Sequence, residues 1–227
     1  MGDIVLNKEV KISELYEQIP YHLEPLFRGY EYPWEILPYI KEYALQLVGC
    51  CGGGYRMPIE GVAVGEGVKI YSGAVIEPPA VIGAGCEIRP GAFIRGGVIA
   101  GEGCVIGNST ELKNCILLDG VQVPHYNYVG DSVLGRKTHL GAGSICSNLR
   151  SDGRSVVIRA DREHDTGLRK VGAFLGDGAD VGCGCVLNPG TVIGKGTVVY
   201  PGSTLRGVFP QGSIVKSQTI VVKKRDK

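Results

Sequence analysis

The stretch VIGAGCEIRPGAFI, residues 81–94, decides the fold. It carries an isoleucine at every sixth position, and glycine or proline falls between successive isoleucines. A helix of period 3.6 and a strand of period 2 each demand a different spacing, whereas a short strand followed by a turn can repeat every six residues. Such hexapeptide repetition predicts a parallel β-helix, in which each side of a coil buries one aliphatic residue.

The same spacing runs through two long parts of the chain. In the first part the aliphatic or small residues are Val64, Ile70, Ile76, Ile82, Ile88, Ile94, Ala100, Ile106 and Leu112. In the second part they are Leu175, Val181, Leu187, Ile193, Val199 and Leu205. Thirty-six glycines against four phenylalanines and one tryptophan suit a narrow interior with many tight corners. We therefore predict an all-β protein whose β-helix spans residues 61–215.

The two ends of the chain lack the repeat. Residues 1–60 are predicted to form a helical segment and a linker, in which three consecutive glycines at 52–54 act as a joint. One face of an amphipathic helix is marked by five apolar residues: Trp34, Leu37, Ile40, Ala44 and Leu47. Residues 216–227 are predicted to be a basic tail.

Composition excludes several function classes. Lys and Arg total 24 against 23 Asp and Glu, so no charge bias favours nucleic acid or an anionic membrane. The chain has no apolar run of about 18 residues, and its first residues lack the pattern of a signal peptide. The eight cysteines form no Cys-x-x-Cys pair and are interpreted as reduced packing residues. We expect a cytoplasmic protein that binds neither nucleic acid nor membrane.

The repeat first breaks between Leu112 and Leu134, which are 22 residues apart, a separation that is not a multiple of six. Pro124 stands where an aliphatic residue is due, so we expect the coil to bulge or to shift phase there. His125 follows in the stretch PHYNYVGDSVLG, residues 124–135. Departures from a consistent pattern are where functional sites are expected. The residues alone leave two interpretations of His125 open, a catalytic histidine and a hydrogen-bonded structural one.

A second break covers residues 147–170, SNLRSDGRSVVIRADREHDTGLRK. Basic and acidic residues alternate in it, so both a functional arm and a solvated loop remain open. A metal site is not predicted, because no His-x-x-x-x-His pair is present and His139 lies fourteen residues after His125 without an obvious third ligand.

Three stretches carry a closer resemblance: GNSTELKN (107–114), PHYNYVGDSVLG (124–135) and HLGAGSICSNLRSDG (139–153). They resemble the C-terminal acetyltransferase domain of the bifunctional N-acetylglucosamine-1-phosphate uridylyltransferase / glucosamine-1-phosphate acetyltransferase family. The segment TGLRKVGAFLGDGADVGCGCVLNPGTVIG, residues 166–194, is similar to archaeal-type sugar-1-phosphate nucleotidylyltransferases with the same domain. The resemblance implies a left-handed prism, a homotrimer, and acetyl transfer from acetyl-CoA to an amino sugar 1-phosphate.

The family's catalytic residues fall on four positions of this sequence. The resemblance makes His125 the general base that takes the proton of the acceptor amine, and Glu111 the carboxylate that orients it. Asn148 matches the asparagine beside the reacting amine. Ala142 matches a residue whose backbone N–H faces the thioester oxygen and stabilises an oxyanion.

The family's binding residues fall on further positions. Arg95, Lys113 and Tyr128 match the sugar-phosphate contacts, as suits a dianionic phosphate. The coenzyme A contacts, besides Ala142, fall on Leu149, Arg154, Cys183 and Pro201. His139 replaces a sugar-contacting asparagine and Leu149 replaces an aromatic residue, so the acceptor is expected to differ.

Two other classes stay open. The family's Rossmann-like nucleotidyltransferase domain has no counterpart in these 227 residues, and no nucleotidyl transfer is expected. The protein could then be a non-catalytic subunit that binds sugar phosphates or nucleotide sugars and serves as a scaffold, although a pure scaffold needs neither His125 nor Lys113. A zinc-dependent hydrase on the same prism would be excluded by elemental analysis showing no metal.

Overall fold

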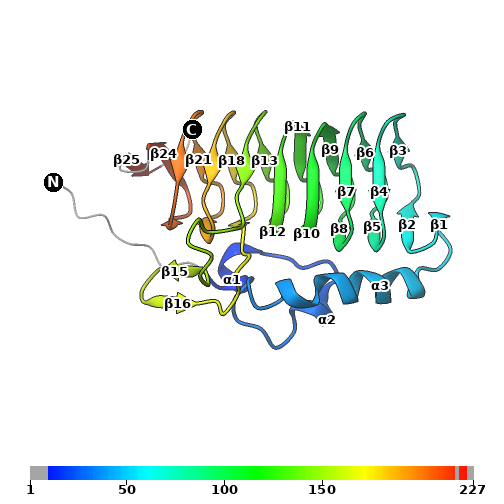
Figure 1. Cartoon of the computed structure of the whole chain (residues 1–227), viewed down its shortest axis with the longest axis horizontal. Coiled ribbons are helices and arrows are strands. Elements are labelled where there is room, and N and C mark those ends of the chain that lie inside the picture. The colour runs from blue at the N-terminus through cyan, green and yellow to red at the C-terminus, as the bar shows by residue number, and fades with distance from the viewer. Residues whose placement is uncertain (1–9, 218–219, 224–227) are drawn as a thin grey trace.

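The computed structural model describes residues 10–217 and 220–223. The chain winds into a parallel β-helix whose coils stack along the long axis of the molecule (Figure 1). Parallel pairing between successive coils gives the strands of each coil backbone hydrogen bonds to the coils on either side. The predicted all-β class with a parallel β-helix is confirmed.

Each coil contributes to three faces. Face 1 contains β2 (Val62–Gly65), β5 (Ala80–Ile82), β8 (Val98–Ala100), β17 (Ala173–Leu175), β20 (Thr191–Ile193) and β23 (Val208–Phe209). Face 2 contains β3 (Lys69–Ile70), β6 (Glu87–Ile88), β9 (Val105–Asn108), β11 (Gln122–His125), β13 (His139–Leu140), β18 (Asp180–Val181), β21 (Val198–Val199) and β24 (Ser213–Ser217). Face 3 contains β4 (Val75–Glu77), β7 (Phe93–Arg95), β14 (Ile145–Cys146), β19 (Val186–Leu187) and β22 (Thr204–Leu205).

Two longer strands turn the corner from face 3 to face 1. They are β10 (Glu111–Leu117) and β12 (Tyr128–Leu134), and they pair with each other in parallel. The first residues of β10 pair with β7 on face 3, and its last residues pair with β8 on face 1. Glu111, Lys113, Tyr128 and Asp131, which are considered below, lie on these two strands.

The predicted six-residue positions line the interior of the prism. All six positions from Leu175 to Leu205 are buried in one core cluster, as are most of those from Val64 to Leu112. The exceptions are Ile70, with 37% of its surface exposed, and the partly buried Ile76, because both lie in the first coil on faces that no other coil covers. Packing of one aliphatic residue above another is thus what holds the coils together.

The break in the repeat comes from corners that are one residue short. Between β7 and β8 the chain turns through Gly96–Gly97, whereas in the next coil a single residue, Asn114, makes the same turn, and Asp131 does so in the coil after. Both residues have left-handed φ angles of 47°. Core positions on either side of each corner are therefore five residues apart instead of six.

The expected bulge at Pro124 is wrong, and the expected shift of phase occurs earlier, at the Asn114 corner. Strand β11 keeps regular pairing across the proline, with Val123 opposite Ile106 and His125 opposite Asn108. The coil absorbs its missing residue earlier, at Asn114, so Pro124 lies in an undistorted strand.

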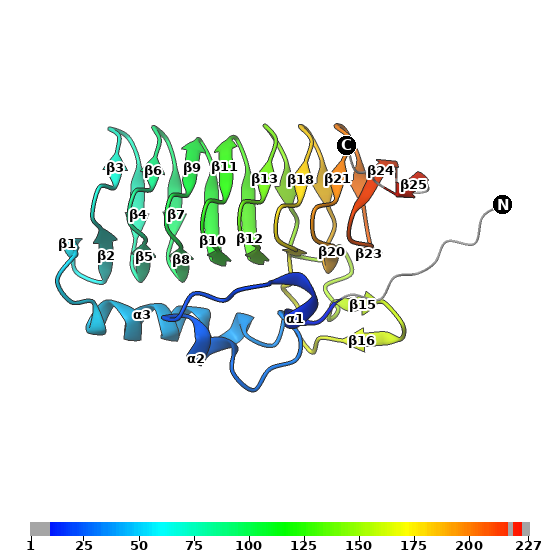
Figure 2. The ribbon, with the colours of Figure 1, turned by 180° about the vertical axis from the view of Figure 1, so that it is seen from behind.

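The N-terminal segment lies along face 1 (Figure 2). It contains α1 (Ile12–Leu15), α2 (Glu24–Phe27), the 3-10 helix η1 (Leu37–Tyr39) and α3 (Ile40–Cys50). Pro38 lies in the first turn of η1, where its missing N–H is tolerated. One outward-facing side chain from each of seven coils is buried in the apolar cluster that the segment and the 147–170 arm form on this face, and these are Ala63, Val81, Ile99, Ile116, Val133, Phe174 and Val192.

The excursion at 147–170 folds back onto the N-terminal segment. Its centre is an antiparallel hairpin of β15 (Val157–Arg159) and β16 (Glu163–Asp165). The His164 ring lies 4.9 Å from the Tyr32 ring and 5.6 Å from the Trp34 ring, measured between centroids. Val156 and Ile158 are buried in the same apolar cluster as Trp34. The arm is thus fixed to its own chain.

An antiparallel strand closes one face at each end of the prism. Strand β1 (Tyr55–Ile59) pairs with β2, so the region after the glycine joint is a strand. Strand β25 (Ile220–Lys223) pairs with β24 within the part predicted to be a basic tail. Residues 1–9, 218–219 and 224–227 lie outside the described residues. None of the helices in the described ranges is long and apolar enough to cross a membrane.

Candidate functional site

Four of the residues proposed from the resemblance stack along the edge between faces 2 and 3. They are His125, Ala142, Cys183 and Pro201, one from each of four successive coils, and all are exposed. The backbone carbonyl of each of the first three accepts an N–H from the glycine that follows the next residue of the stack, at 3.0, 2.8 and 2.8 Å. A ligand lying along this edge could therefore contact all four positions.

Backbone strain concentrates around the same coils. Non-glycine residues with left-handed φ angles occur, among the described residues, only between positions 109 and 137, and they are Ser109, Asn114, Tyr126, Asp131 and Lys137. Tyr126 has φ 51° directly after His125, and Ser109 takes the equivalent turn in the preceding coil. The coils before Ser109 and after Tyr126 have glycine at this turn, Gly91 and Gly143. A bulky residue in this conformation is costly, and such residues cluster at functional sites.

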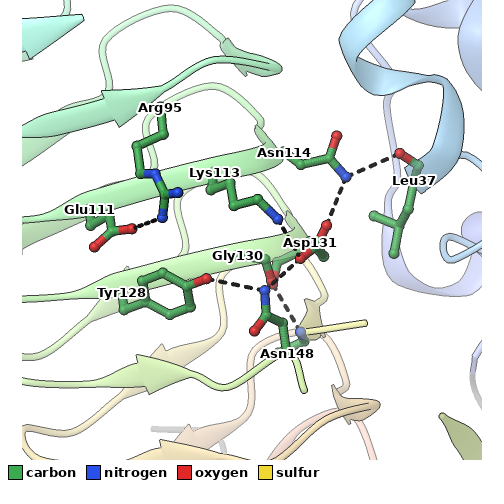
Figure 3. A network of polar contacts seen from close by, with 11 residues as sticks. Leu37, Arg95, Glu111, Lys113, Asn114, Tyr128, Gly130, Asp131 and Asn148 are labelled. Atoms are coloured by element: carbon green, nitrogen blue, oxygen red, sulfur yellow. Dashed lines mark hydrogen bonds and ion pairs between the residues drawn. The ribbon is translucent and has the colours of Figure 1, made fainter. Parts of the chain in front are cut away.

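A cluster of polar side chains covers face 3 beside this edge (Figure 3). Strand pairing puts Arg95 next to Lys113 and Glu111 next to Tyr128. Arg95 Nη1 lies 2.7 Å from Glu111 Oε1, and both side chains are more than one-third exposed. The hydrogen bond to Glu111 raises the pKa of Arg95 above its already high usual range. Face 3 thus presents two cations at neighbouring positions.

Asp131 lies at the centre of this cluster, with only 8% of its side chain exposed. Its carboxylate accepts hydrogen bonds from Asn114 Nδ2 at 2.9 Å and from Asn148 Nδ2 at 2.5 Å. Lys113 Nζ lies 3.5 Å from Asp131 Oδ2. A buried carboxylate without such partners would be strongly destabilising, so these three donors account for its presence in the corner.

Asn148 links Asp131 to Tyr128. The second hydrogen of Asn148 Nδ2 points to the Tyr128 hydroxyl at 3.1 Å. Burial and the nearby Asp131 charge raise the pKa of Tyr128, so its hydroxyl stays protonated. Gly130 leaves room for these two side chains, because a Cβ there would lie 2.7 Å from Asn148 Nδ2.

The pairing expected between Glu111 and His125 is not formed. Glu111 binds Arg95, and the described residues offer the His125 ring no hydrogen-bond partner. The register explains the separation, because Glu111 lies opposite Tyr128, three residues along from His125. The corner at Tyr126 separates them, because His125 ends face 2 and Glu111 begins face 3. The two side chains lie on either side of this corner, and that of Glu111 is turned to Arg95.

The remaining predicted residues lie elsewhere. His139 lies on face 2, where its Nδ1 is 2.8 Å from Asp180 Oδ1. Leu149 lies at the base of the arm, exposed and bridged to Lys170. Arg154 is exposed in the arm, where its backbone N–H donates to Asp152. Face 3 therefore holds Arg95, Lys113 and Tyr128, which were predicted to contact the sugar phosphate, whereas the arm and face 2 hold the three residues described here.

Sequence reasoning gave no role to Asn114, Gly130 or Asp131. All three lie within the stretches that carry the resemblance, and the two polar ones stand where neighbouring coils use glycine. The replacement of a corner glycine by a polar residue is the feature of the sequence that could have pointed to Asn114 and Asp131. The described residues contain no group of three side chains that could hold a metal ion.

Two family models match the prism. A bacterial transferase hexapeptide model with six repeats matches residues 61–96, and a GMPPB C-terminal domain model matches residues 90–162. Among solved structures, a mutant of perosamine N-acetyltransferase from Caulobacter crescentus with CoA and GDP-perosamine has a TM-score of 0.41 and 21% identity, over 70% of this chain and 57% of that one. The acetyltransferase domain of PglB from Neisseria gonorrhoeae has a TM-score of 0.40 and 20% identity, over 65% and 53%.

Curated relatives match through part of their length. The bifunctional protein GlmU of Methanococcus maripaludis is 30% identical over 122 residues, which is 53% of this chain and 30% of the relative. A bifunctional sugar-1-phosphate nucleotidylyltransferase/acetyltransferase of Sulfurisphaera tokodaii is 40% identical over 72 residues, 31% of this chain and 18% of the relative. The chain spans less than a third of these relatives. It is a hexapeptide-repeat β-helix protein, similar in sequence to the C-terminal region of these bifunctional sugar-phosphate proteins.

Proposed function

We propose that the protein transfers an acetyl group from acetyl-CoA to the amine of an amino sugar 1-phosphate. The observation that carries this proposal is the arrangement on face 3, where Arg95, Lys113, Tyr128 and Asn148 lie side by side next to the exposed edge of His125. Two cations and a phenol suit a dianionic phosphate, and an amide suits an amine. The sequence similarity to the bifunctional sugar-phosphate proteins supports the same activity.

The chemistry assigned to His125 is general-base catalysis. Its imidazole takes a proton from the acceptor nitrogen as that nitrogen forms a bond to the thioester carbonyl carbon. The backbone N–H of Ala142, one coil further along the same edge, is assigned to the oxyanion that develops on the carbonyl oxygen. The carbon–sulfur bond then breaks, and coenzyme A leaves as a thiol with the proton returned by the imidazolium.

Glu111 has a different part in this proposal from the one that the resemblance implied. Its ion pair with Arg95 holds the guanidinium over face 3, where Lys113 is the adjacent cation. A phosphate bound between Arg95 and Lys113 would meet a guanidinium already held in place. Positioning of this kind reduces the conformational freedom lost on binding.

A second candidate is a binding domain without turnover. It is favoured by the contact of Glu111 with Arg95, which leaves the His125 ring without an orienting carboxylate among the described residues. The match of residues 90–162 to the GMPPB C-terminal domain fits this candidate equally well. It predicts sugar-phosphate binding with no release of thiol.

The assembly and compartment belong to the same proposal. We infer a cytoplasmic homotrimer from the family resemblance, and sedimentation equilibrium would measure a mass of three chains. A monomer with full activity would contradict the assembly.

The test is thiol release from acetyl-CoA with a panel of amino sugar 1-phosphates. His125→Ala is expected to lower kcat by about 10²–10⁴-fold, the usual contribution of a general base. His22→Ala is the matched control, because His22 is exposed in the N-terminal segment. An undiminished rate in His125→Ala would refute the assigned base. Binding of a sugar 1-phosphate without any thiol release from wild type would favour the second candidate.

A further inference from the structure

The carboxylate of Asp131 is the most deeply buried charge beside face 3, and its contacts leave little freedom to its neighbours. It lies in a corner with a left-handed φ angle, and three different residues direct donors at its two oxygens. Asn114 contacts Oδ1, whereas Asn148 and Lys113 contact Oδ2. The carboxylate therefore fixes the orientation of groups that Figure 3 shows around it.

The Asn148 amide can take one orientation only. Both hydrogens of its Nδ2 have acceptors, Asp131 Oδ2 and the Tyr128 hydroxyl. An amide turned by half a rotation would direct its carbonyl oxygen at a buried carboxylate, which is repulsive in a corner with little water. In Figure 3 the Asn148 oxygen lies on the side away from Asp131. The network thus presents an acceptor, not a donor, at the free end of this amide.

We propose that Asp131 is a positioning residue for the acetyl acceptor, which acts by turning the carbonyl oxygen of Asn148 toward the acceptor amine. An ammonium offers only N–H donors, and the neutral amine that attacks the thioester has N–H donors besides its lone pair. An acceptor at this point can therefore hold an N–H and leave the lone pair free for the carbonyl carbon. The inference rests on the proposed function, because it assumes that an amine is the group bound beside Asn148.

The same carboxylate connects the amine contact with the phosphate contact. Lys113 lies against Oδ2, the oxygen that also accepts from Asn148. One buried charge therefore sets the distance between the cation assigned to the phosphate and the amide assigned to the amine. A sugar that carries both groups at the matching separation would satisfy both at once.

Asn114 holds the other side of the carboxylate. Its Nδ2 donates to Asp131 Oδ1 and, at 3.2 Å, to the backbone carbonyl of Leu37 in the N-terminal segment. Its amide is therefore oriented from both sides. The hydrogen bond from Asn114 holds the plane of the carboxylate, whose Oδ2 contacts Asn148 and Lys113.

The test is Asp131→Asn, which keeps the size of the side chain and tolerates the left-handed corner. An amide has only one oxygen, so it cannot replace both carboxylate oxygens, which accept from Asn114 and from Asn148. We expect the Asn148 amide to rotate so that its carbonyl oxygen accepts from the introduced NH2 group. We expect kcat/KM for the acceptor to fall about 10–100-fold, as for a misplaced contact group, while KM for acetyl-CoA stays within about twofold. Asp119→Asn, at another corner, is the matched control and should change neither constant.

A double-mutant cycle separates positioning from a general loss of structure. In the Asn148→Ala background, Asp131→Asn should have clearly less effect on kcat/KM than in wild type, because the residue through which it acts is gone. Additive effects, or an equal fall in all constants with a lower active fraction, would overturn the proposal.

A measurement without substrate keeps this inference distinct from the proposed function. The side-chain NH2 signals of Asn148, assigned by their loss in Asn148→Ala, should shift and exchange faster with solvent in Asp131→Asn. Undisturbed signals would overturn the inference even in an active enzyme. Wild type that acetylates no acceptor would refute the proposed function and the acceptor role together, whereas displaced signals would still support the Asp131–Asn148 contact.

Discussion

The substitution Gly130→Ala should disturb the side chains of the candidate site on face 3 much more than it lowers the stability of the fold. It is therefore the most informative change to the candidate site. The φ angle of Gly130 is not left-handed, so the backbone accepts alanine. The added Cβ would lie 2.7 Å from Asn148 Nδ2 and 2.8 Å from Tyr128 Cζ, whereas ordinary contacts are 3.4–4 Å. Both groups are side-chain ends, which can move by about 1 Å at a cost of roughly 1–3 kcal/mol in stability, as overpacking usually costs.

The same displacement is far more damaging to catalysis. A shift of about 1 Å in a positioning group can lower the rate about 10²-fold. We therefore expect Gly130→Ala to fold, to unfold at a temperature within several degrees of wild type, and to lose about two orders of magnitude in kcat/KM for the acceptor. Thermal unfolding and thiol release from acetyl-CoA measure the two effects.

The control is Gly53→Ala, since nothing lies within 4 Å of a Cβ at that position and its φ angle is also not left-handed. It should match wild type in both assays. Activity of Gly130→Ala within about threefold of wild type would refute the assignment of Tyr128 and Asn148 to the acceptor site. Failure of the variant to fold would refute the claim that the neighbouring side chains can move aside.

Two further predictions concern packing and the exposed edge. Trp34 is 4% exposed, so Trp34→Ala should destabilise the docking of the N-terminal segment by about 3–5 kcal/mol, seen as faster proteolysis of residues 10–50 with a protected prism; equal proteolysis of both parts would contradict separate docking. Burial raises the pKa of Cys115 far above its usual range and that of Cys146 to about 12, so neither thiol should react with a disulfide reagent at pH 8 in the folded protein. Cys50 and Cys183 are exposed and should react, and acetyl-CoA should protect Cys183 but not Cys50 if the edge binds the cofactor; equal protection of both would count against that edge.

The six-residue spacing predicted the β-helix because its physical cause is local. Each coil must supply one small or aliphatic side chain per face, and nearly all of those positions are buried. The end of the prism is the exception, since burial of Ile70 would need a coil that is not there. The amphipathic pattern from Trp34 likewise predicted the helical region, although its first turn is a 3-10 helix and α3 begins only at Ile40.

The position of the phase shift could not be predicted with the same pattern. Leu117 and Leu118 are adjacent, and the six-residue count selects Leu118, although Leu117 is the residue in the prism core. The six-residue count therefore does not reveal that the corner at Asn114 is one residue short. It places the break at Pro124, although the break lies earlier in the coil.

Contacts of the candidate site depended on register, which the sequence pattern did not define. The resemblance assigned Glu111 to His125, but the pairing of β10 with β12 puts Glu111 beside Tyr128, and Arg95 reaches it from the coil before. The role of Asp131 is also a property of the stack, because its three donors come from positions 17 or 18 residues away.

The reversed strands at the two ends of the prism have a consequence for solubility at high concentration. A stack of parallel coils is open-ended, and its last coil could serve as a template for another molecule, as in a growing fibril. Strand β1 runs against β2 at one end and β25 runs against β24 at the other, so an incoming coil would meet a strand of the wrong direction on one face. Continuous end-to-end polymerisation of prisms is thereby blocked at both ends by the chain itself.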